Sequence, residues 1–316
     1  MNPEGVALAS GKILDQVATA IVGKRNVLEK MLLAILCDGH VLIEDYPGLA
    51  KTLMAKSFAT ALGCAFKRVQ FTPDLLPADI TGTYIFDRKA SEFVLRKGPV
   101  FTNVLLADEI NRAPPKTQAA LLEAMQERQT TLEGETHPLP RPFVVFATQN
   151  PIEYEGTYPL PEAQVDRFLM RIDIGYPTRE QEKEVLDRRR ARRSDDVVIK
   201  AVSNPPEILA LQAAIEDVHV DEDLERYIVE IVARTREHSQ VEVGASPRGS
   251  LALMKLGRAR AALKGRDYVV PDDIKEIAVE SLAHRILLKP DPWIKGVQTA
   301  SIVREVLAAV PVPKVE

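Results

Sequence analysis

The amino-acid sequence of 316 residues predicts an α/β domain with a parallel sheet, followed by a smaller all-α domain. Two observations support this prediction. Up to about residue 177, short β-rich apolar runs alternate with helical patterns, which is typical of an open sheet covered by helices. From about residue 178 onward the chain reads as successive helices, so Pro177 marks the expected boundary between domains 1–177 and 178–316.

Five apolar segments of the first part are the expected strands. They read VLI (41–43), AFKRVQF (65–71), NVLLA (103–107), FVVFA (143–147) and FLMRIDI (168–174). VLLA and FVVFA are nearly continuous apolar runs, which indicates strands that are buried on both faces of a sheet.

Two further segments are expected to form hairpins at the surface. The first lies within about residues 71–100, where TYIFD and EFVLR flank DRKAS. The second spans about residues 128–140 and turns at Glu133-Gly134. Long surface loops of this kind often carry function.

The expected helices of the second part follow IGYPTREQE. Pro247 and Pro271 each stand near a helix start, where the missing proline N–H costs little. The run RRRARR (188–193) has acidic neighbours on both sides. We therefore interpret it as a solvated helix face, and a nucleic-acid partner is not expected.

The composition limits the possible classes of function. Hydrophobic residues make up 46% and charged residues 27% of the chain, as in ordinary globular proteins. The net charge of −4 provides no global basic field for nucleic acid or anionic lipid. The longest apolar stretch, residues 31–37, is far shorter than the roughly 20 residues of a membrane span, so no direct membrane insertion is expected. Cys37 and Cys64 form no metal or disulfide pattern, which fits a reducing cytoplasm.

The stretch VLIEDYPGLAKTL (41–53) resembles a strand that runs into a phosphate-binding loop. It keeps Lys51 and Thr52 of the pattern G-x-x-x-x-G-K-[ST], but Asp45 and Ala50 replace both flanking glycines. Aspartate tolerates left-handed backbone geometry, and Ala50 is expected to need only helical dihedral angles because the helix begins there. The charge of Asp45 must point away from a triphosphate or be neutralised. Taken alone, the stretch is equally consistent with a buried strand that ends in a snorkelling lysine.

A second motif favours the nucleotide interpretation. VLLADEINRAP (104–114) is an apolar strand that ends in Asp108-Glu109, about 50 residues after the loop. In a nucleotide site, one such carboxylate can hold Mg²⁺ through water, and the second can polarise the attacking water.

Three more segments carry polar residues that fit the same site. In FVVFATQNP, Gln149-Asn150 end a buried strand and could orient water, although a strand-end amide that caps a loop is the alternative. Arg167 stands in LPEAQVDRF, where a lone arginine is usually solvated. Arg248, in GASPRG, lies in the first turn of a helix, where a cation opposes the helix dipole, and this mismatch hints at an anion nearby.

Together these strings resemble the MoxR family of AAA+ ATPases. The resemblance rests on EDYPGLAKT, LLADEINRAPPKTQAALLEAMQE, FATQNPIEYEGTYPLPEAQVDRF and GASPRG, and it runs from about residue 10 to the C-terminal VPVP. It implies a P-loop αβα AAA+ core with sheet order 5-1-4-3-2, a C-terminal all-α lid domain and ATP bound between the two. The hairpins at about 71–100 and 128–140 resemble the helix-2 and pre-sensor-1 insertions of the clade that includes magnesium chelatase.

The resemblance also implies the residues that hold ATP and Mg²⁺. Lys51 would contact the β- and γ-phosphates, Thr52 would bind Mg²⁺, and Asp108 would lie in the outer sphere of the metal. Glu109 would activate water. The other loop residues expected at the nucleotide are Asp45, Tyr46, Pro47, Gly48, Leu49, Ala50 and Leu53.

The remaining roles implied by the resemblance involve both domains. Asn150 would match sensor 1, and Arg248 would match sensor 2 and reach the γ-phosphate from the lid. Arg167 would be the arginine finger that enters the site of the neighbouring subunit. Val22 and Gly23 would line the adenine pocket.

The implied function is hydrolysis of Mg-ATP by a homo-oligomeric ring, a hexamer, that remodels, matures or activates a client protein. The partner would carry a von Willebrand factor A domain, in chaperone-like maturation or metal insertion. An isolated protomer should hydrolyse ATP poorly, because a finger in trans is worth roughly 10³–10⁵ in rate. Two alternatives stay open: a non-hydrolysing nucleotide-sensing adaptor whose loop Asp45 has spoiled, and the ATPase subunit of a metal chelatase.

Overall fold

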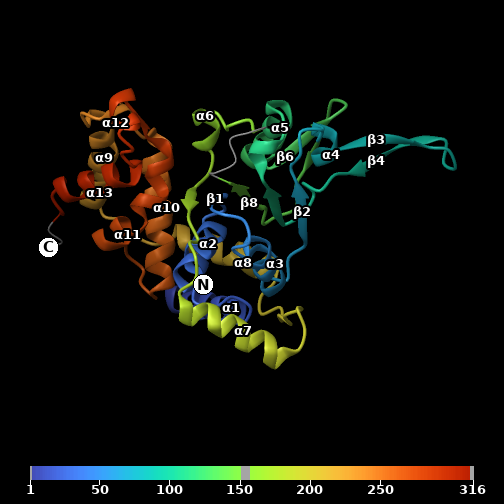
Figure 1. The fold of residues 1–316 in the computed structure, drawn as a ribbon, viewed down its shortest axis with the longest axis horizontal. Helices are drawn as coiled ribbons and strands as arrows, with labels where there is room; N and C mark the ends of the chain where they lie inside the picture. The colour runs from blue at the N-terminus through green and yellow to red at the C-terminus, as the bar shows by residue number, and fades with distance from the viewer. Residues whose placement is uncertain (1, 151–156, 314–316) are drawn as a thin grey trace.

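The computed structural model describes residues 2–150 and 157–313 (Figure 1). A central parallel sheet separates two groups of elements. The last helices of the chain, over residues 222–309, gather at one side of it, and a long β-hairpin projects from the other side (Figure 1). Within the described residues, no helix combines the length and the apolar composition that crossing a membrane requires.

The central sheet has five parallel strands in the order β2-β5-β8-β1-β9. Numbered among themselves, these strands read 2-3-4-1-5, so the predicted order 5-1-4-3-2 is confirmed. The inner strands are almost entirely buried, as their continuous apolar runs predict. The bounds of the five strands are β1 Val41–Glu44, β2 Phe66–Gln70, β5 Val104–Asp108, β8 Val144–Gln149 and β9 Met170–Ile172.

Helices cover both faces of the sheet because successive strand residues point to opposite sides. Val41 and Ile43 pack with the side chains of α1, α2 and α3, whereas Leu42 packs with those of α5. Helix α3 directly continues the loop after β1, so its start lies at the carboxyl edge of the sheet. These helices are α1 (Pro3–Ala18), α2 (Arg25–Leu36), α3 (Lys51–Ala61) and α5 (Pro115–Glu127).

Both predicted hairpins are present, as β3–β4 and β6–β7. At the root of β3–β4 the backbone segments approach closely: a Cβ on Gly98 would lie 2.2 Å from the carbonyl oxygen of Ile80. Glycine is therefore required there. The second hairpin turns at Glu133-Gly134, as predicted. The elements are α4 (Pro77–Thr81), β3 (Gly82–Asp87), β4 (Glu92–Lys97), β6 (Gln129–Leu132) and β7 (Glu135–Pro138).

The C-terminal part is helical and shares a continuous apolar core with α1–α3. Helix α8 packs against α1, α2 and α10, and Gln212 on α8 donates a hydrogen bond to the carbonyl of Ile35 (2.7 Å). The domain boundary expected at Pro177 therefore stays a prediction. The elements are α8 (Pro205–Glu216), α9 (Glu222–Glu237), β10 (Val241–Val243), α10 (Pro247–Leu263), α11 (Pro271–Leu282), η2 (Ala283–Arg285), β11 (Leu287–Leu288), α12 (Pro290–Ile294) and α13 (Thr299–Ala309).

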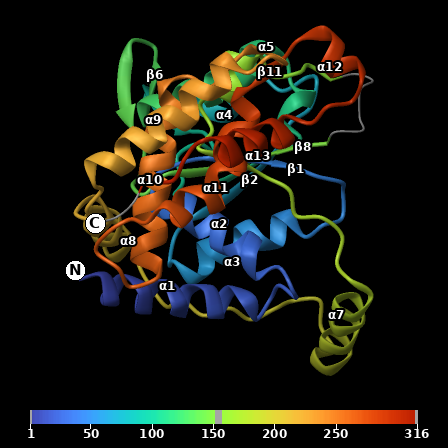
Figure 2. The ribbon, with the colours of Figure 1, turned by 90° about the vertical axis from the view of Figure 1, so that its left-hand side faces the viewer.

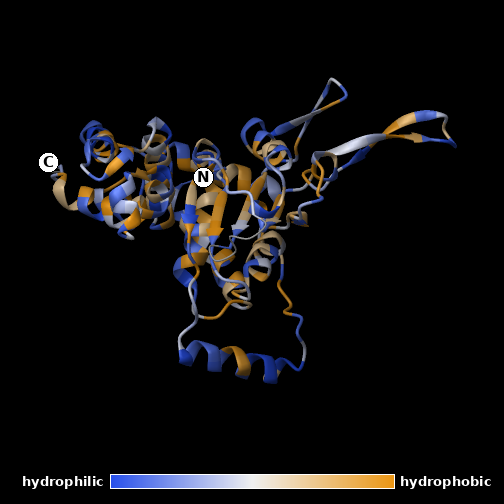
Figure 3. Ribbon diagram, turned by 45° about the horizontal axis from the view of Figure 1, so that its top comes forward, coloured by the Kyte–Doolittle hydropathy of each residue, from blue (hydrophilic) through white to orange (hydrophobic). Residues whose placement is uncertain are grey.

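Helix α7 (Arg179–Arg192) stands apart from the body of the molecule (Figures 2 and 3). All 14 of its residues are described, and none is buried. The helix is stabilised by local interactions rather than by apolar packing. These are a capping box at Thr178 and the exposed ion pairs Lys183–Asp187 and Glu184–Arg188, each one turn apart. A helix without a buried residue is exposed to solvent on every face. This agrees with the interpretation of RRRARR as a solvated face.

Candidate nucleotide-binding site

A cavity of about 530 Å³ opens at the carboxyl edge of the sheet, around the start of α3. It brings together the phosphate-loop candidate, the acidic pair and Asn150, which are far apart in sequence. Its lining residues are Pro47, Gly48, Leu49, Ala50, Lys51, Thr52, Leu53, Arg68, Gln70, Asp108, Glu109, Thr148 and Asn150.

The carboxylate of Asp45 points away from this cavity. It is 5% exposed and accepts hydrogen bonds from the backbone N–H groups of Tyr46 (2.8 Å), Ile174 (2.6 Å) and Gly175 (2.6 Å). These donors stabilise the negative charge and tie the loop to the chain that follows β9. The charge of Asp45 is therefore no obstacle to a triphosphate.

Ala50 differs from the expectation. It is not helical but left-handed, with φ 59° and ψ 22°, and it is the N-cap of α3. Among the described non-glycine residues with positive φ, the loop contributes Ala50 and not Asp45. The expectation for Ala50 was wrong because the helix begins one residue later, at Lys51, which leaves Ala50 as the non-helical N-cap. A left-handed residue at that point usually costs about 1–2 kcal/mol when it carries a Cβ.

The start of α3 is ready to bind an anion. Within the described chain, no side chain caps the first turn of this helix, so its backbone N–H groups remain available. The Lys51 Nζ donates to the carbonyl oxygen of Asp45 (2.5 Å). Burial lowers the pKa of the Lys51 ammonium below its ordinary value, and three nearby carboxylates oppose this effect.

A hydrogen-bond network holds Asp108 at the end of β5. Its Oδ1 accepts from the hydroxyl of Thr148 (2.6 Å), which in turn accepts from the backbone N–H of Glu109 (2.8 Å). Its Oδ2 accepts from Arg68 Nη2 (2.6 Å) and Nε (3.0 Å).

The Glu109 carboxylate has two donors. Gln70 Nε2 lies 2.6 Å and Arg112 Nη1 lies 3.1 Å from Glu109 Oε2. Glu109 is itself left-handed, with φ 55° and ψ 51°, and it precedes the short helix η1 (Ile110–Arg112). The left-handed conformation ends the extended strand at Glu109, whose side chain lines the cavity.

Sequence reasoning missed four residues of this network: Arg68, Gln70, Arg112 and Thr148. One signal was present for two of them. In AFKRVQF, Arg68 and Gln70 stand two residues apart on a strand, so they share one face. The register then pairs Gln70 with Asp108, which only the fold reveals.

Arg167 and Arg248 do not line this cavity; they lie together at a second one of about 260 Å³. Arg167 Nη1 donates to the carbonyl of Leu122 (3.1 Å). Arg248 Nη1 lies 3.6 Å from Asp166 Oδ2. The structure thus places Arg248 beside Arg167 rather than beside Lys51.

The expected adenine residues also lie outside the cavity lining. Val22 is buried, and the carbonyl of Gly23 accepts a hydrogen bond from Gln181 Nε2 on α7 (3.2 Å). Tyr46 stacks on Tyr176, with ring centroids 5.5 Å apart and planes 23° apart. The roles proposed for Val22 and Gly23 stay predictions.

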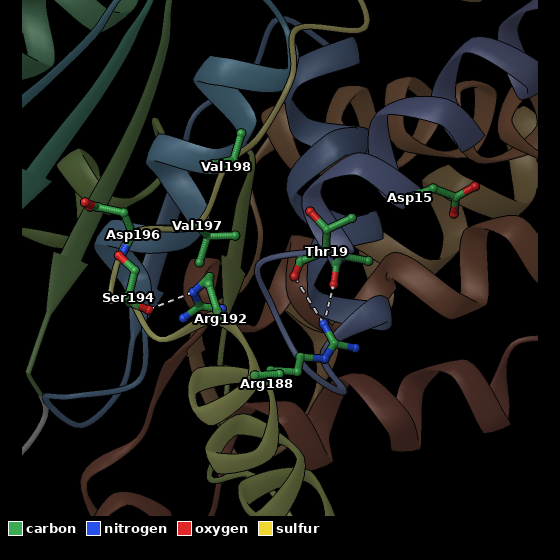
Figure 4. A pocket seen from close by; sticks show the side chains of 10 residues that line it. Asp15, Thr19, Arg188, Arg192, Ser194, Asp196, Val197 and Val198 are labelled. Carbon is green, nitrogen blue, oxygen red and sulfur yellow. Dashed lines mark hydrogen bonds between the residues drawn. The ribbon is translucent and has the colours of Figure 1, made fainter.

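Another cavity, of about 1020 Å³, lies elsewhere, between α1 and α7 (Figure 4). Arg188 Nη1 donates to the carbonyls of Ala18 and Thr19 (3.2 Å each), and Arg192 Nε donates to that of Ser194 (2.9 Å). These arginines hold α7 to the C-terminus of α1 and order the chain that follows it. We therefore do not assign a ligand to this cavity.

The donor set at the first cavity fits a magnesium-bound triphosphate. The uncapped helix start and the Lys51 ammonium suit phosphate oxygens. The Thr52 hydroxyl and the Asp108 carboxylate are hard oxygen ligands, which Mg²⁺ prefers. Glu109 supplies a second carboxylate to the lining of the same cavity.

Comparisons with known proteins show the family of the chain. Residues 40–170 match the model for the ATPase family associated with various cellular activities (AAA), and residues 233–306 match that for the AAA lid domain. The chain is 48% identical to the uncharacterised protein YeaC of Bacillus subtilis, over 96% of this chain and 94% of that protein. It is 44% identical to the chaperone MoxR1 of Mycobacterium tuberculosis, over 96% of this chain and 82% of that one.

A solved structure is also similar. A crystal structure from Cytophaga hutchinsonii, of a protein assigned as an ATPase, superimposes with a TM-score of 0.93. The two chains share 42% identity, over 99% of this chain and 97% of that one.

Proposed function

The chain belongs to the MoxR family of AAA+ ATPases, and we propose that it hydrolyses Mg-ATP at the cavity around Lys51 and uses the energy to remodel or activate a client protein. One observation carries the proposal. Lys51, Thr52 and the pair Asp108-Glu109, more than 50 residues apart, face one cavity at an uncapped helix start.

Each residue then has a defined task. Lys51 and the first N–H groups of α3 hold the phosphates, while Thr52 and Asp108 hold Mg²⁺. Bound there, Mg²⁺ neutralises phosphate charge. Glu109 accepts a proton from the attacking water, and Asn150 orients that water.

We assign Arg167 and Arg248 to the ATP site of a neighbouring subunit in a ring. Both line the second cavity, apart from the phosphate loop of their own chain. Two guanidinium groups are suited to the charge that develops on a transferred phosphoryl group. The site is therefore complete only in the oligomer, which we propose to be a hexamer.

The client is proposed to bind at the projecting β3–β4 hairpin. Phe86 and Phe93 near its tip are 54% and 70% exposed and stack edge to face. Figure 3 shows apolar colour near this tip. A partner with a von Willebrand factor A domain remains our proposal for the client complex.

We infer that the complex is cytoplasmic, because Cys37 and Cys64 are free thiols.

Steady-state ATP hydrolysis at increasing protein concentration tests this function. We expect phosphate release that requires Mg²⁺ and whose rate per chain rises with protein concentration. Lys51→Ala should abolish it, while the exposed Lys56→Ala on the same helix should not. Absence of hydrolysis at every concentration would instead support the nucleotide-sensing adaptor. A chelatase ATPase subunit would give the same rates, so only isolation of the client separates that alternative.

A further inference from the structure

A buried arginine of the C-terminal part holds the chain on both sides of Arg167. Arg285, at the end of η2, has a side chain that is 3% exposed. Its Nη1 donates to the carbonyl of Asp166 (2.7 Å) and its Nη2 to that of Phe168 (2.7 Å). Its Nε donates to the carbonyl of Ser281 (2.8 Å), at the end of α11. The residues before and after Arg167 are thus fixed to the lid.

The Asp166 carboxylate connects the same arginine to the start of α10. It accepts a hydrogen bond from Arg285 Nη1 and another from the hydroxyl of Ser246 (3.1 Å). Ser246 is the N-cap of α10, and the guanidinium of Arg248 lies 3.6 Å from the carboxylate. The Asp166 carboxylate therefore contacts Arg285, which holds the residues on both sides of Arg167, and also the helix that carries Arg248.

The two arginines at this network line the same cavity. Arg167 Nε is buried and has no hydrogen-bond partner within the described chain. The Arg248 side chain is 49% exposed at the same cavity. The exposed guanidinium of Arg248 can therefore donate to a phosphate oxygen from outside the chain at the cavity that Arg167 also lines.

We propose that Asp166 and Arg285 are positioning residues that fix the distance between Arg167 and Arg248 for one phosphoryl group of the neighbouring subunit's ATP. The inference rests on the proposed function, in which both arginines act in trans. Arg285 uses its planar fork to hold two carbonyls at once, which lysine cannot reproduce. A displacement of about 1 Å at a reacting group can reduce the rate by roughly 10².

Asp166→Asn tests the proposal, because it keeps the shape but removes the charge. We expect kcat for ATP to fall at least tenfold while KM changes little, and the thermal unfolding midpoint to fall as well, because Arg285 stays buried without its carboxylate partner. Activity should return when Lys51→Ala protein is added, since those subunits supply an intact Asp166 to sites that can still bind ATP. Arg285→Lys should show the same loss and the same rescue, and it replaces Asp166→Asn if that variant fails to fold.

A matched pair controls for damage to the fold. Arg266 and the buried Asp273 form an ion pair (2.7 Å) beyond the opposite end of α10. Asp273→Asn should lower stability without a tenfold loss of kcat. The proposal is wrong if Asp166→Asn keeps kcat within twofold, or if Lys51→Ala rescues Arg167→Ala but not Asp166→Asn. If neither is rescued in mixed rings, the trans site itself is wrong, and the positioning role with it.

Discussion

At the scale of single residues, the two departures from glycine in the phosphate loop have opposite consequences. Asp45 gains three backbone hydrogen bonds that a glycine could not make. Ala50 is left-handed, which glycine adopts at lower cost. The first replacement stabilises the loop, whereas the second strains it.

Asp45→Ala should lower the free energy of unfolding by about 3 kcal/mol, because it leaves the buried N–H of Ile174 and the partly buried N–H of Gly175 without an acceptor. Asp45→Asn keeps one acceptor oxygen and should lose less. Urea denaturation measures both, with the exposed Asp196→Ala as the control. An unchanged midpoint for Asp45→Ala would contradict the role of this carboxylate.

Ala50→Gly should raise the free energy of unfolding by up to about 1 kcal/mol. The gain is the relief of left-handed strain, reduced by the greater freedom of glycine in the unfolded chain. Ala191→Gly, in the last turn of the exposed helix α7, should instead lower the free energy of unfolding, because glycine is a poor helix former. If both variants lose stability equally in urea denaturation, Ala50 is not strained.

At the scale of elements, strand β2 supplies polar groups to the site from one face. Arg68 and Gln70 reach the acidic pair, while Lys67 and Val69 belong to the other face. The sequence predicts this strand within one residue at each end, since AFKRVQF corresponds to Phe66–Gln70. The family resemblance predicts that β5 is the neighbour of β2, but not the register that sets Gln70 opposite Asp108, because register depends on contacts between distant segments. The partners of Asp108 and Glu109 were missed for that reason.

Gln70→Ala should reduce kcat for ATP roughly tenfold, since the Glu109 carboxylate loses the donor that orients it. KM for ATP should change little, because Gln70 is not proposed to hold phosphates. Steady-state kinetics measures both, with Lys67→Ala on the opposite face as the matched control. Equal kcat in Gln70→Ala and the parent would show that Glu109 needs no support from β2.

At the scale of the whole molecule, the placement of the lid decides which residues can share a site. The sequence predicts the sheet order and brings Lys51, Thr52 and the acidic pair together through the family resemblance, and the structure places all of them at one cavity. It does not predict that Arg248 lies beside Arg167. The start of α10 is positioned by Asp166 and Arg285 across the boundary between sheet and helices, and no local pattern encodes that contact.

The stability of the whole chain should decrease as the pH falls below about 6.5. His40 and His284 are buried, and burial holds the pKa of each well below its ordinary value of 6.5. The unfolded chain therefore binds protons that the folded chain cannot bind. Each histidine contributes a slope of about 1.4 kcal/mol per pH unit below 6.5 until the folded protein itself protonates.

Urea denaturation between pH 7.5 and 5.5 measures this slope. His40→Gln and His284→Gln should each reduce the slope of unfolding free energy against pH by the contribution of one proton. This reduction is expected whether or not the substitution also lowers stability at pH 7.5. A free energy of unfolding that stays constant over this range would show that neither histidine is held neutral.

The central claim, that Lys51, Thr52, Asp108 and Glu109 serve one magnesium-bound nucleotide, is tested most directly by ATP binding and hydrolysis in Lys51→Ala and Glu109→Gln. Calorimetric titration with Mg-ATP should show binding to Glu109→Gln and none to Lys51→Ala. Phosphate release by Glu109→Gln should be at least about 10² slower than in the parent. Hydrolysis at the parent rate by Glu109→Gln, or undiminished ATP binding by Lys51→Ala, would contradict the claim.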